Sequence, residues 1–114
     1  MSFLTKKGLI AAGCFGLLLA APSIFGQKKA GDAAKGKDVF ESNCSVCHNA
    51  DSEEKKMGPG LKGLFKHEKL KNGKKVTEAN VRAILEAGGG GMPSYADMLQ
   101  DDEKADIIAY LKTL

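Results

Sequence analysis

The sequence predicts an all-α domain. Three stretches repeat their apolar residues at intervals of three and four, which places those residues on one side of a helix. No stretch alternates apolar and polar residues in the way that a half-buried strand does. Because three helices of this length cannot enclose a large core by themselves, we expect a bulky apolar group to fill the middle of the domain.

The first predicted helix covers residues 32–43. Asp32 belongs to the residue types favoured at helix starts, because its side chain can accept hydrogen bonds from free backbone N–H groups. Gly36, Val39 and Phe40 lie on one side at helical spacing. We therefore expect this side to face the core, and the helix to end where a cysteine motif begins.

Two loops and one apolar patch separate the first helix from the second. Residues 49–60 are rich in charge and end in two glycines around Pro59, which predicts a loop. The pair Asn72-Gly73 is a turn signal. The apolar patch between them, predicted as a single helical turn, consists of Leu61, Leu64 and Phe65.

The second predicted helix runs from Glu78 to about Ala87. Thr77 can cap its start, and Gly88 ends it as a glycine at the C′ position does. The apolar stripe of this helix consists of Val81, Ile84 and Leu85. The glycine-rich stretch 88–93 that follows is predicted as a loop.

The last predicted helix starts near Gln100 or Asp101 and runs to the C-terminus. Acidic residues in its first turn lie at the positive end of the helix dipole, where they stabilise the helix. Its predicted buried face consists of Ile107, Tyr110, Leu111 and Leu114. We expect Met98 to pack against the core just before this helix.

The first 26 residues are predicted to be a secretory signal peptide. Two lysines precede an uncharged, mostly apolar run from Gly8 to Ala21, and a small-x-small cleavage pattern follows at residues 21–23. The alternative is a retained membrane anchor, because the chain stays uncharged up to Gly26, close to the roughly 20 residues that a spanning helix needs. The predicted domain covers residues 27–114 in a periplasmic or otherwise exported protein, which an uncleaved N-terminus would hold at the membrane.

The charge of the chain is nearly balanced. It has 17 basic and 14 acidic residues, and removal of Lys6 and Lys7 with the signal peptide leaves 15 against 14. Such a balance excludes a typical nucleic-acid-binding protein. Eight lysines are nevertheless concentrated in one stretch, here called the lysine-rich surface: Lys55, Lys56, Lys62, Lys66, Lys69, Lys71, Lys74 and Lys75. This surface is either a solvated face or one that steers a protein partner.

The segment C-S-V-C-H at residues 44–48 has three chemical interpretations. A structural zinc site needs four ligands, usually in two pairs, and no second cysteine pair is present once Cys14 leaves with the signal peptide. A thiol redox pair of this spacing belongs near a βαβ pattern, which the sequence lacks. A haem anchor explains the order of the residues, because two neighbouring thiols can bond the porphyrin vinyl groups while His48 faces the iron.

A low-spin haem that transfers electrons needs a second axial ligand, and methionine sulfur is the usual choice because it raises the reduction potential. Met92 is the first candidate. Four preceding glycines let the backbone approach a flat ligand closely, and Pro93 stiffens the chain after the sulfur. Met57, Met98 and His67 are explained more simply as a loop residue, a packing residue and a solvated side chain.

From about residue 32 to residue 114 the chain resembles the small single-haem class I cytochromes c. Four segments match that family in order: GKDVFESNCSVCHN, GPGLKGLF, GMPSY and DDEKADIIAYLKTL. The resemblance implies one haem c bonded to Cys44 and Cys47, with His48 as the proximal iron ligand and Met92 as the distal one.

The same resemblance implies the surroundings of the haem. The family's proline, here Pro59, presents its carbonyl to the N–H of the proximal imidazole, and Leu61 packs on the haem. The N- and C-terminal helices cross closely, with Gly36 allowing the close approach. Many relatives place a tryptophan or tyrosines beside the haem propionates; this chain has no tryptophan, so Tyr95 or lysines could take that place.

The function implied by the resemblance is electron transport by a monomeric carrier. The iron passes single electrons between a donor and an acceptor redox protein, and the protein is not an enzyme. Two alternative functions are compatible with the sequence. The domain could be a membrane-tethered haem subunit of a dehydrogenase or respiratory complex, or a haem-based sensor of gas or peroxide if the bond from Met92 is labile.

Overall fold

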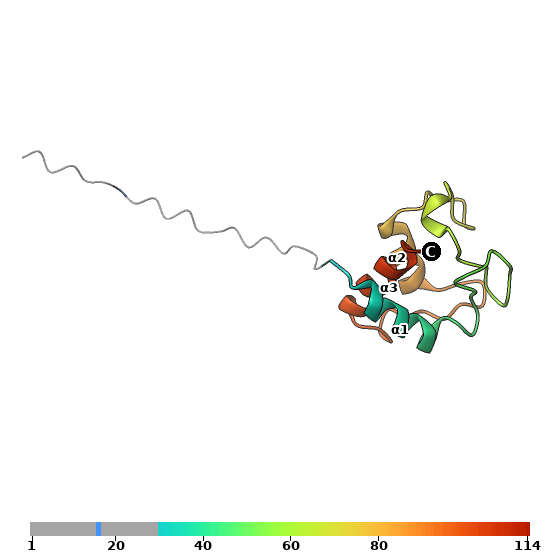
Figure 1. Cartoon of the computed structure of the whole chain (residues 1–114), viewed down its shortest axis with the longest axis horizontal. Helices are drawn as coiled ribbons and strands as arrows, with labels where there is room; N and C mark the ends of the chain where they lie inside the picture. The colour runs from blue at the N-terminus through green and yellow to red at the C-terminus, as the bar shows by residue number, and fades with distance from the viewer. Residues whose placement is uncertain (1–15, 17–29) are drawn as a thin grey trace, which may run out of the picture.

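The computed structural model describes Gly16 and residues 30–114 of the chain. The predicted signal peptide, residues 1–26, lies outside the described residues apart from Gly16. The described part contains four helical segments: α1 (Ala33–Asn43), the short 3-10 helix η1 (Leu64–Lys66), α2 (Glu78–Ala87) and α3 (Asp101–Leu111) (Figure 1). No strand occurs among these residues, so the predicted all-α fold is confirmed. Within the same residues, no helix has the length and apolar character that crossing a membrane requires.

The helix starts are fixed by the local sequence. Oδ1 of Asp32 accepts hydrogen bonds from the backbone N–H groups of Ala34 (2.9 Å) and Lys35 (3.2 Å) at the start of α1. Oγ1 of Thr77 accepts one from the N–H of Asn80 (3.1 Å) at the start of α2. The predicted caps are confirmed, and they explain why both helices begin where the sequence places them.

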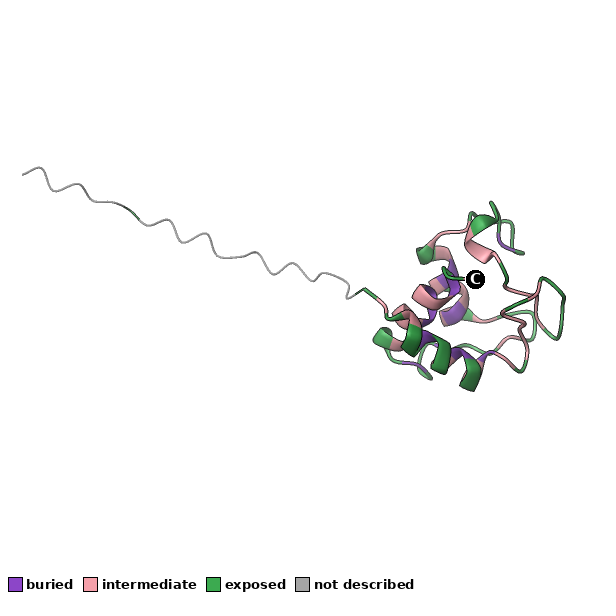
Figure 2. Cartoon of the chain, viewed as in Figure 1, coloured by how far each residue is buried: buried purple, intermediate pink, exposed green. Residues whose placement is uncertain are grey.

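The helices α1 and α3 pack against each other (Figure 1). A Cβ atom at Gly36 would overlap the backbone carbonyl of Asp106 and lie 2.9 Å from Cβ of Tyr110, so only glycine fits at this position. Phe40 and Ile107, on the facing sides of the two helices, are 2% and 1% exposed. The predicted crossing is confirmed, and Figure 2 shows buried residues where the helices meet.

The contact between the two helices continues at both ends of the crossing. The rings of Phe40 and Tyr110 lie 5.4 Å apart between centroids with their planes inclined by 59°, a favourable geometry for aromatic pairs. At the other end, the backbone N–H of Asp32 donates to Oδ1 of Asp106 (2.7 Å). Burial of Phe40 alone stabilises the fold by about 2–3 kcal/mol.

The prediction that the last helix reaches the C-terminus is wrong, because α3 ends at Leu111. The carbonyl of Tyr110 accepts hydrogen bonds from both the N–H and the hydroxyl of Thr113 (2.9 and 2.6 Å). The chain therefore tightens into a turn after Leu111. Lys112 faces Glu78 of α2 in an ion pair, which holds this turn against the neighbouring helix.

The prediction that Met98 packs before the last helix is also wrong. Its side chain is 63% exposed, whereas the next residue, Leu99, is 6% exposed and lies in the core. The register is set by Tyr95, whose N–H donates to the carbonyl of Leu85 (2.8 Å) and whose carbonyl accepts from the N–H of Leu99 (3.3 Å). This turn directs residue 99, not residue 98, toward α2 and α3.

Lys104 is the one buried charged side chain among the described residues, with 4% of its surface exposed. Its Nζ donates to the carbonyl of Ala96 (2.8 Å) and lies 3.7 Å from carboxylate oxygens of Glu86 and Asp101. Arg82 contacts the same two carboxylates at 3.0 and 2.6 Å. This cluster connects the segment before α3 to α2 and to α3 itself.

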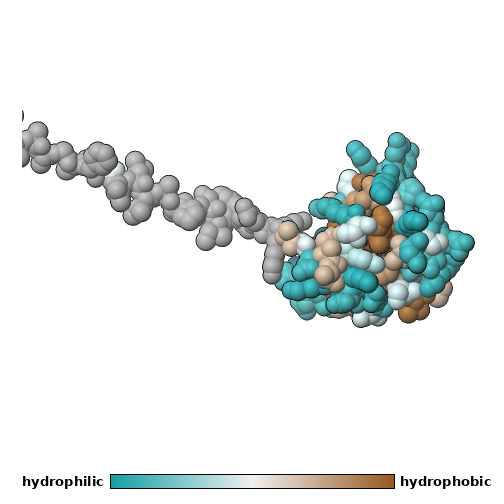
Figure 3. All heavy atoms as spheres, viewed as in Figure 1, coloured by the Kyte–Doolittle hydropathy of each residue, from teal (hydrophilic) through white to brown (hydrophobic). Residues whose placement is uncertain are grey.

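All eight residues of the lysine-rich surface are exposed. Lys66 is the last residue of η1, and the other seven lie in the loops on either side of it. Beside them lies a solvent-open hollow of about 490 Å³, lined by Phe65, His67, Glu68, Lys69, Lys75 and Val76. Figure 3 shows hydrophilic residues over most of the visible face of the domain, with hydrophobic atoms between them.

Candidate functional site

The segment 44–48 forms a tight turn at the end of α1. The N–H of Cys44 donates to the carbonyl of Phe40 (2.7 Å), and the carbonyl of Cys44 accepts from the N–H groups of Cys47 (3.1 Å) and His48 (2.9 Å). No disulfide joins the two cysteines; Cys44 is buried and Cys47 is half-buried. One turn of the chain therefore holds both thiols and the imidazole together, as the sequence predicts.

The environment of Cys44 distinguishes among the interpretations of the motif. Burial, with a smaller effect from the neighbouring Cys47, raises the pKa of the Cys44 thiol to about 11. A redox-active pair needs a thiol of lowered pKa, so the structure does not support a thiol oxidoreductase. In the described part of the chain, no group of three or more His, Cys, Asp or Glu side chains could hold a metal ion, so a structural zinc site has no support either.

The imidazole of His48 is held by Pro59. Nδ1 of His48 lies 2.8 Å from the carbonyl oxygen of Pro59, as the resemblance implies. A carbonyl can only accept, so Nδ1 carries the hydrogen and the lone pair belongs to Nε2. A metal-bound histidine is typically oriented in this way by a contact to its second nitrogen. His48 is therefore prepared to bind a metal through Nε2.

Gly58 brings the proline loop against this ring. A Cβ atom at position 58 would overlap Cε1 of His48 and lie 2.8 Å from Nδ1, so a side chain there would displace the imidazole. The N–H of Gly58 also donates to the carbonyl of Cys47 (2.8 Å). From the sequence, Gly58 is predicted only as part of a loop. The signal that could have identified it is the Gly-Pro-Gly sequence, in which a glycine precedes the residue that contacts His48.

Met92 lies at the end of a turn built from four glycines. Their φ angles are all positive, at 65°, 120°, 61° and 93° for Gly88 to Gly91, a region that L side chains rarely adopt. Gly89 and Met92 exchange two backbone hydrogen bonds (2.9 and 3.0 Å) that close the turn. Met92 is half-buried and packs against the core cluster. These positive φ angles explain why glycines occupy residues 88–91. That the sulfur of Met92 ligates the iron stays a prediction.

The other methionine and histidine candidates lie on the surface. Met57 is 77% exposed, and its sulfur lies 3.8 Å from that of Cys47. His67 is exposed, with Nε2 3.3 Å from a carboxylate oxygen of Glu53. Leu61, predicted to pack on the haem, is half-buried against the core cluster. Of the candidates for the second ligand, Met92 is therefore the one that packs against the core.

Tyr95 makes a contact that the sequence does not predict. Its side chain is 7% exposed, and its hydroxyl donates to the carbonyl of Asn43 (3.1 Å), the residue before Cys44. Burial raises the pKa of the Tyr95 phenol, and the thiols of Cys44 and Cys47 add to the effect, so the hydroxyl keeps its proton at neutral pH. No local sequence pattern signals a bond between residues 52 positions apart.

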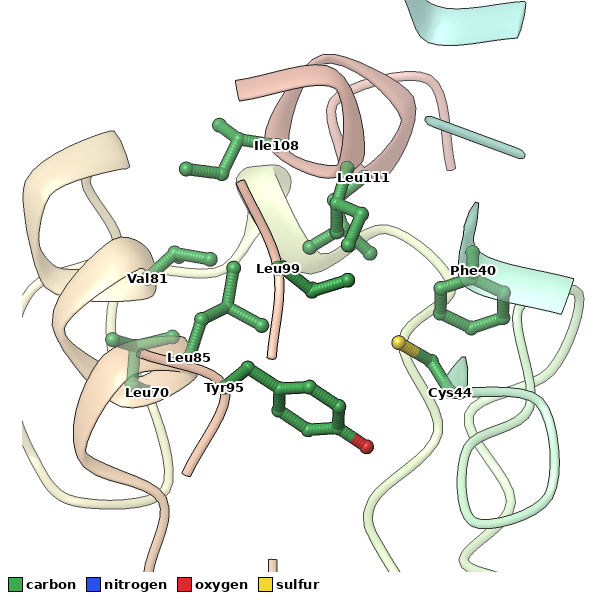
Figure 4. Packing of buried hydrophobic residues seen from close by; sticks show 10 residues of the cluster. Phe40, Cys44, Leu70, Val81, Leu85, Tyr95, Leu99, Ile108 and Leu111 are labelled. Carbon is green, nitrogen blue, oxygen red and sulfur yellow. The ribbon is translucent and has the colours of Figure 1, made fainter. Parts of the chain in front are cut away.

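The side chains gathered here fit a covalently attached haem. Two free thiols of one turn can form thioethers, and the orientation of His48 leaves Nε2 for an iron ion. Nitrogen and thioether sulfur together are a donor pair used by iron in electron-transfer haems. Figure 4 shows the sulfur of Cys44 pointing into the space between Phe40, Leu99 and Tyr95, so the site opens onto the hydrophobic core.

Comparison with known proteins identifies the family. Residues 31–111 match the family described as cytochrome c oxidase, cbb3-type, subunit III. The chain is 32% identical over 107 residues to cytochrome c of Chlamydomonas reinhardtii, an alignment that covers 79% of this chain and 96% of the relative. The chain belongs to the small class I cytochromes c.

Two further matches to this cytochrome agree with that identification. Cytochrome c6 of Leptolyngbya boryana is 35% identical over 80 residues, covering 70% of this chain and 89% of the relative. The crystal structure of cytochrome c6 from the diatom Phaeodactylum tricornutum superposes with a TM-score of 0.59 and 25% identity, covering 73% of this chain and 93% of the other. As a member of this family, the cytochrome carries covalently attached haem c, transfers electrons with redox partners and is a carrier rather than an enzyme.

Proposed function

We propose that this cytochrome is an exported single-electron carrier whose haem is bonded to Cys44 and Cys47 and whose iron is ligated by His48 and Met92. The observation that carries the proposal is the hydrogen bond from Nδ1 of His48 to the carbonyl of Pro59, which leaves Nε2 as the free donor atom. When bound, the haem supplies an iron that alternates between Fe(III) and Fe(II).

The residues of the chain set the chemistry of that iron. The carbonyl of Pro59 accepts a hydrogen bond from Nδ1–H and so fixes the ring of His48. This hydrogen bond also makes Nε2, the other ring nitrogen, a stronger electron-pair donor to the iron. The thioether of Met92 favours the reduced state and so raises the reduction potential. The apolar residues of the core keep water away from the haem face. This also favours the reduced haem, which has the lower net charge.

Two protein ligands leave no site on the iron for a substrate. A closed coordination shell is the property that separates a carrier from a gas sensor or a weak peroxidase. We therefore expect the reduced protein to bind carbon monoxide slowly and only partly at neutral pH, as monitored by absorption spectroscopy. Rapid, complete binding at that pH would favour the sensor over the carrier.

Electrons are proposed to enter and leave at the haem edge next to the thioether cysteines. Two apolar side chains of this region are strongly exposed: Val46 (72%) and Met57 (77%), whose sulfur lies beside Cys47. The lysine-rich surface includes Lys55 and Lys56, which precede Met57, so an acidic redox partner would be attracted to the same side of the molecule.

This docking proposal predicts a marked dependence on salt. Surface charges are screened over about 10 Å at 0.1 M ionic strength and about 3 Å at 1 M. The second-order rate of electron exchange with an acidic partner should therefore fall at least tenfold between 0.01 M and 0.5 M salt, measured by stopped flow. A rate that stays constant or rises with salt would assign the lysines to a solvated face.

Residues 1–26 are proposed to direct export and to be removed afterwards, leaving residues 27–114 as a periplasmic carrier. The family match to an oxidase subunit favours a second candidate, in which an uncleaved N-terminus tethers the domain to a respiratory complex. N-terminal sequencing of the purified protein separates the two. A chain that begins near Ile24 or Gln27 supports the free carrier, whereas one that begins at Met1 or Ser2 supports the tethered subunit.

A further inference from the structure

The side chain of Tyr95 connects two parts of the proposed haem site. Tyr95 lies three residues after Met92, and its ring is buried among core residues that include Leu85 and Leu99. In Figure 4 its hydroxyl oxygen points away from these leucines, toward the side of the core that holds Cys44. The partner of the hydroxyl is the carbonyl of Asn43 at 3.1 Å, 52 positions away in the chain.

The acceptor of this hydrogen bond is held rigidly. Asn43 is the last residue of α1, and its own side-chain Nδ2 donates to the carbonyl of Val39 one turn earlier (2.9 Å). The next residue, Cys44, continues the helical pattern through its bond to the carbonyl of Phe40 (2.7 Å). Tyr95 therefore binds to a fixed point immediately before the first thioether cysteine.

The loop that bears Met92 has few other connections to that side of the molecule. Three of its hydrogen bonds run to α2: from the hydroxyl of Ser94 to the carbonyl of Glu86 (2.5 Å), from the N–H of Tyr95 to the carbonyl of Leu85 (2.8 Å) and from the N–H of Gly88 to the carbonyl of Ile84 (2.8 Å). A fourth joins it to α3, from Nζ of Lys104 to the carbonyl of Ala96 (2.8 Å). Within residues 30–114, the Tyr95 hydroxyl makes the one hydrogen bond that joins residues 88–99 to residues 33–48.

We propose that Tyr95 is a positioning residue that holds Met92 at bonding distance from the iron by tying its loop to the backbone that precedes Cys44. The inference rests on the proposed function, in which Cys44 anchors one edge of the haem and Met92 ligates its iron. The haem is fixed to residues 44–48 by covalent bonds, whereas Met92 follows four glycines, which have more backbone freedom than other residues. A bond between the two segments limits how far the sulfur can move away from the metal.

The test is competition by imidazole for the distal site of the oxidised, haem-loaded protein at neutral pH. Tyr95→Phe removes the hydroxyl and keeps the ring, so the core remains filled. We expect it to bind imidazole about three to ten times more tightly than the wild type, as one lost hydrogen bond implies. Binding is followed through loss of the sulfur-to-iron charge-transfer absorption at the red end of the spectrum.

Tyr110→Phe is the matched control. It removes the same hydroxyl from a half-buried tyrosine in the crossing of α1 and α3, where no hydrogen bond of that hydroxyl occurs among the described residues. If Tyr95→Phe and Tyr110→Phe bind imidazole equally, while the wild type shows the charge-transfer band, the positioning role of Tyr95 is wrong. A wild type without that band would instead overturn the ligation by Met92, and the role of Tyr95 with it.

Discussion

Replacement of Met92 by alanine is expected to open the iron and to lower the reduction potential by at least about 0.1 V. Axial ligands move haem potentials over a range of about 0.8 V, and a thioether stabilises the reduced iron more than the water or hydroxide that would take its place. The variant should lose its sulfur-to-iron charge-transfer band and should bind carbon monoxide rapidly when reduced. Potentiometric titration and absorption spectra measure both effects.

Met98→Ala provides a control with the same chemical change. Met98 lies six positions further along the same connection to α3, but its side chain is 63% exposed. We expect the reduction potential and the absorption spectrum of the Met98→Ala variant to match those of the wild type. Met57→Ala, at the 77% exposed methionine beside Cys47, is expected to behave in the same way. An unchanged spectrum and potential in Met92→Ala would show that the ligand is misassigned.

The second large effect is expected from Gly36→Ala. In an exposed helix interior this change stabilises a protein by about 1 kcal/mol, because alanine has the higher helix propensity. At position 36 the added Cβ would overlap the carbonyl of Asp106, a backbone atom that cannot rotate away. The helices α1 and α3 would have to separate, which would open the packing of Phe40 and Ile107. We expect a loss of about 3 kcal/mol in the free energy of unfolding, the upper end of what overpacking a core usually costs.

Urea denaturation of the haem-loaded protein measures this loss. Lys35→Ala is the control, because Lys35 neighbours Gly36 in α1 and its side chain is exposed. Its unfolding midpoint should lie close to that of the wild type. A midpoint for Gly36→Ala equal to or above that of Lys35→Ala would mean that the two helices do not cross as closely as the structure places them.

The features that the sequence predicts well are local ones. The starts of α1 and α2 depend on Asp32 and Thr77, whose side chains bond to residues two or three positions away. The end of α2 depends on Gly88, which adopts a φ of 65°. In each case the residue type alone decides the backbone conformation, so no knowledge of the rest of the fold is needed.

The features that the sequence misses depend on distant partners. The end of α3 is set by a turn around Tyr110 and by the pairing of Lys112 with Glu78, and no glycine or proline marks it. Lys104 occupies the apolar stripe that continues through Ile107 and Leu111 at helical spacing. Its place in this stripe is consistent with burial. The acceptor of the Lys104 ammonium group, however, is the carbonyl of Ala96, which lies in an irregular segment whose path cannot be read from local sequence patterns.

In the candidate site, too, contacts between residues close in sequence are predictable and contacts between distant residues are not. The cysteine pair and His48 are adjacent in the chain, so their order alone predicts their proximity. The contact of His48 with Pro59 spans 11 positions and followed only from resemblance to a family. The bond of Tyr95 to Asn43 spans 52 positions, and only the three-dimensional structure places these two residues together.

The mass of the purified, denatured protein tests the central claim most directly. If Cys44 and Cys47 bond the haem, mass spectrometry should show the chain plus one haem, and the complex should keep its haem in acidified organic solvent. In Cys44→Ser/Cys47→Ser the added mass should be absent. A wild-type chain at the mass of its polypeptide alone, produced in cells with a working c-type haem attachment system, would contradict the account.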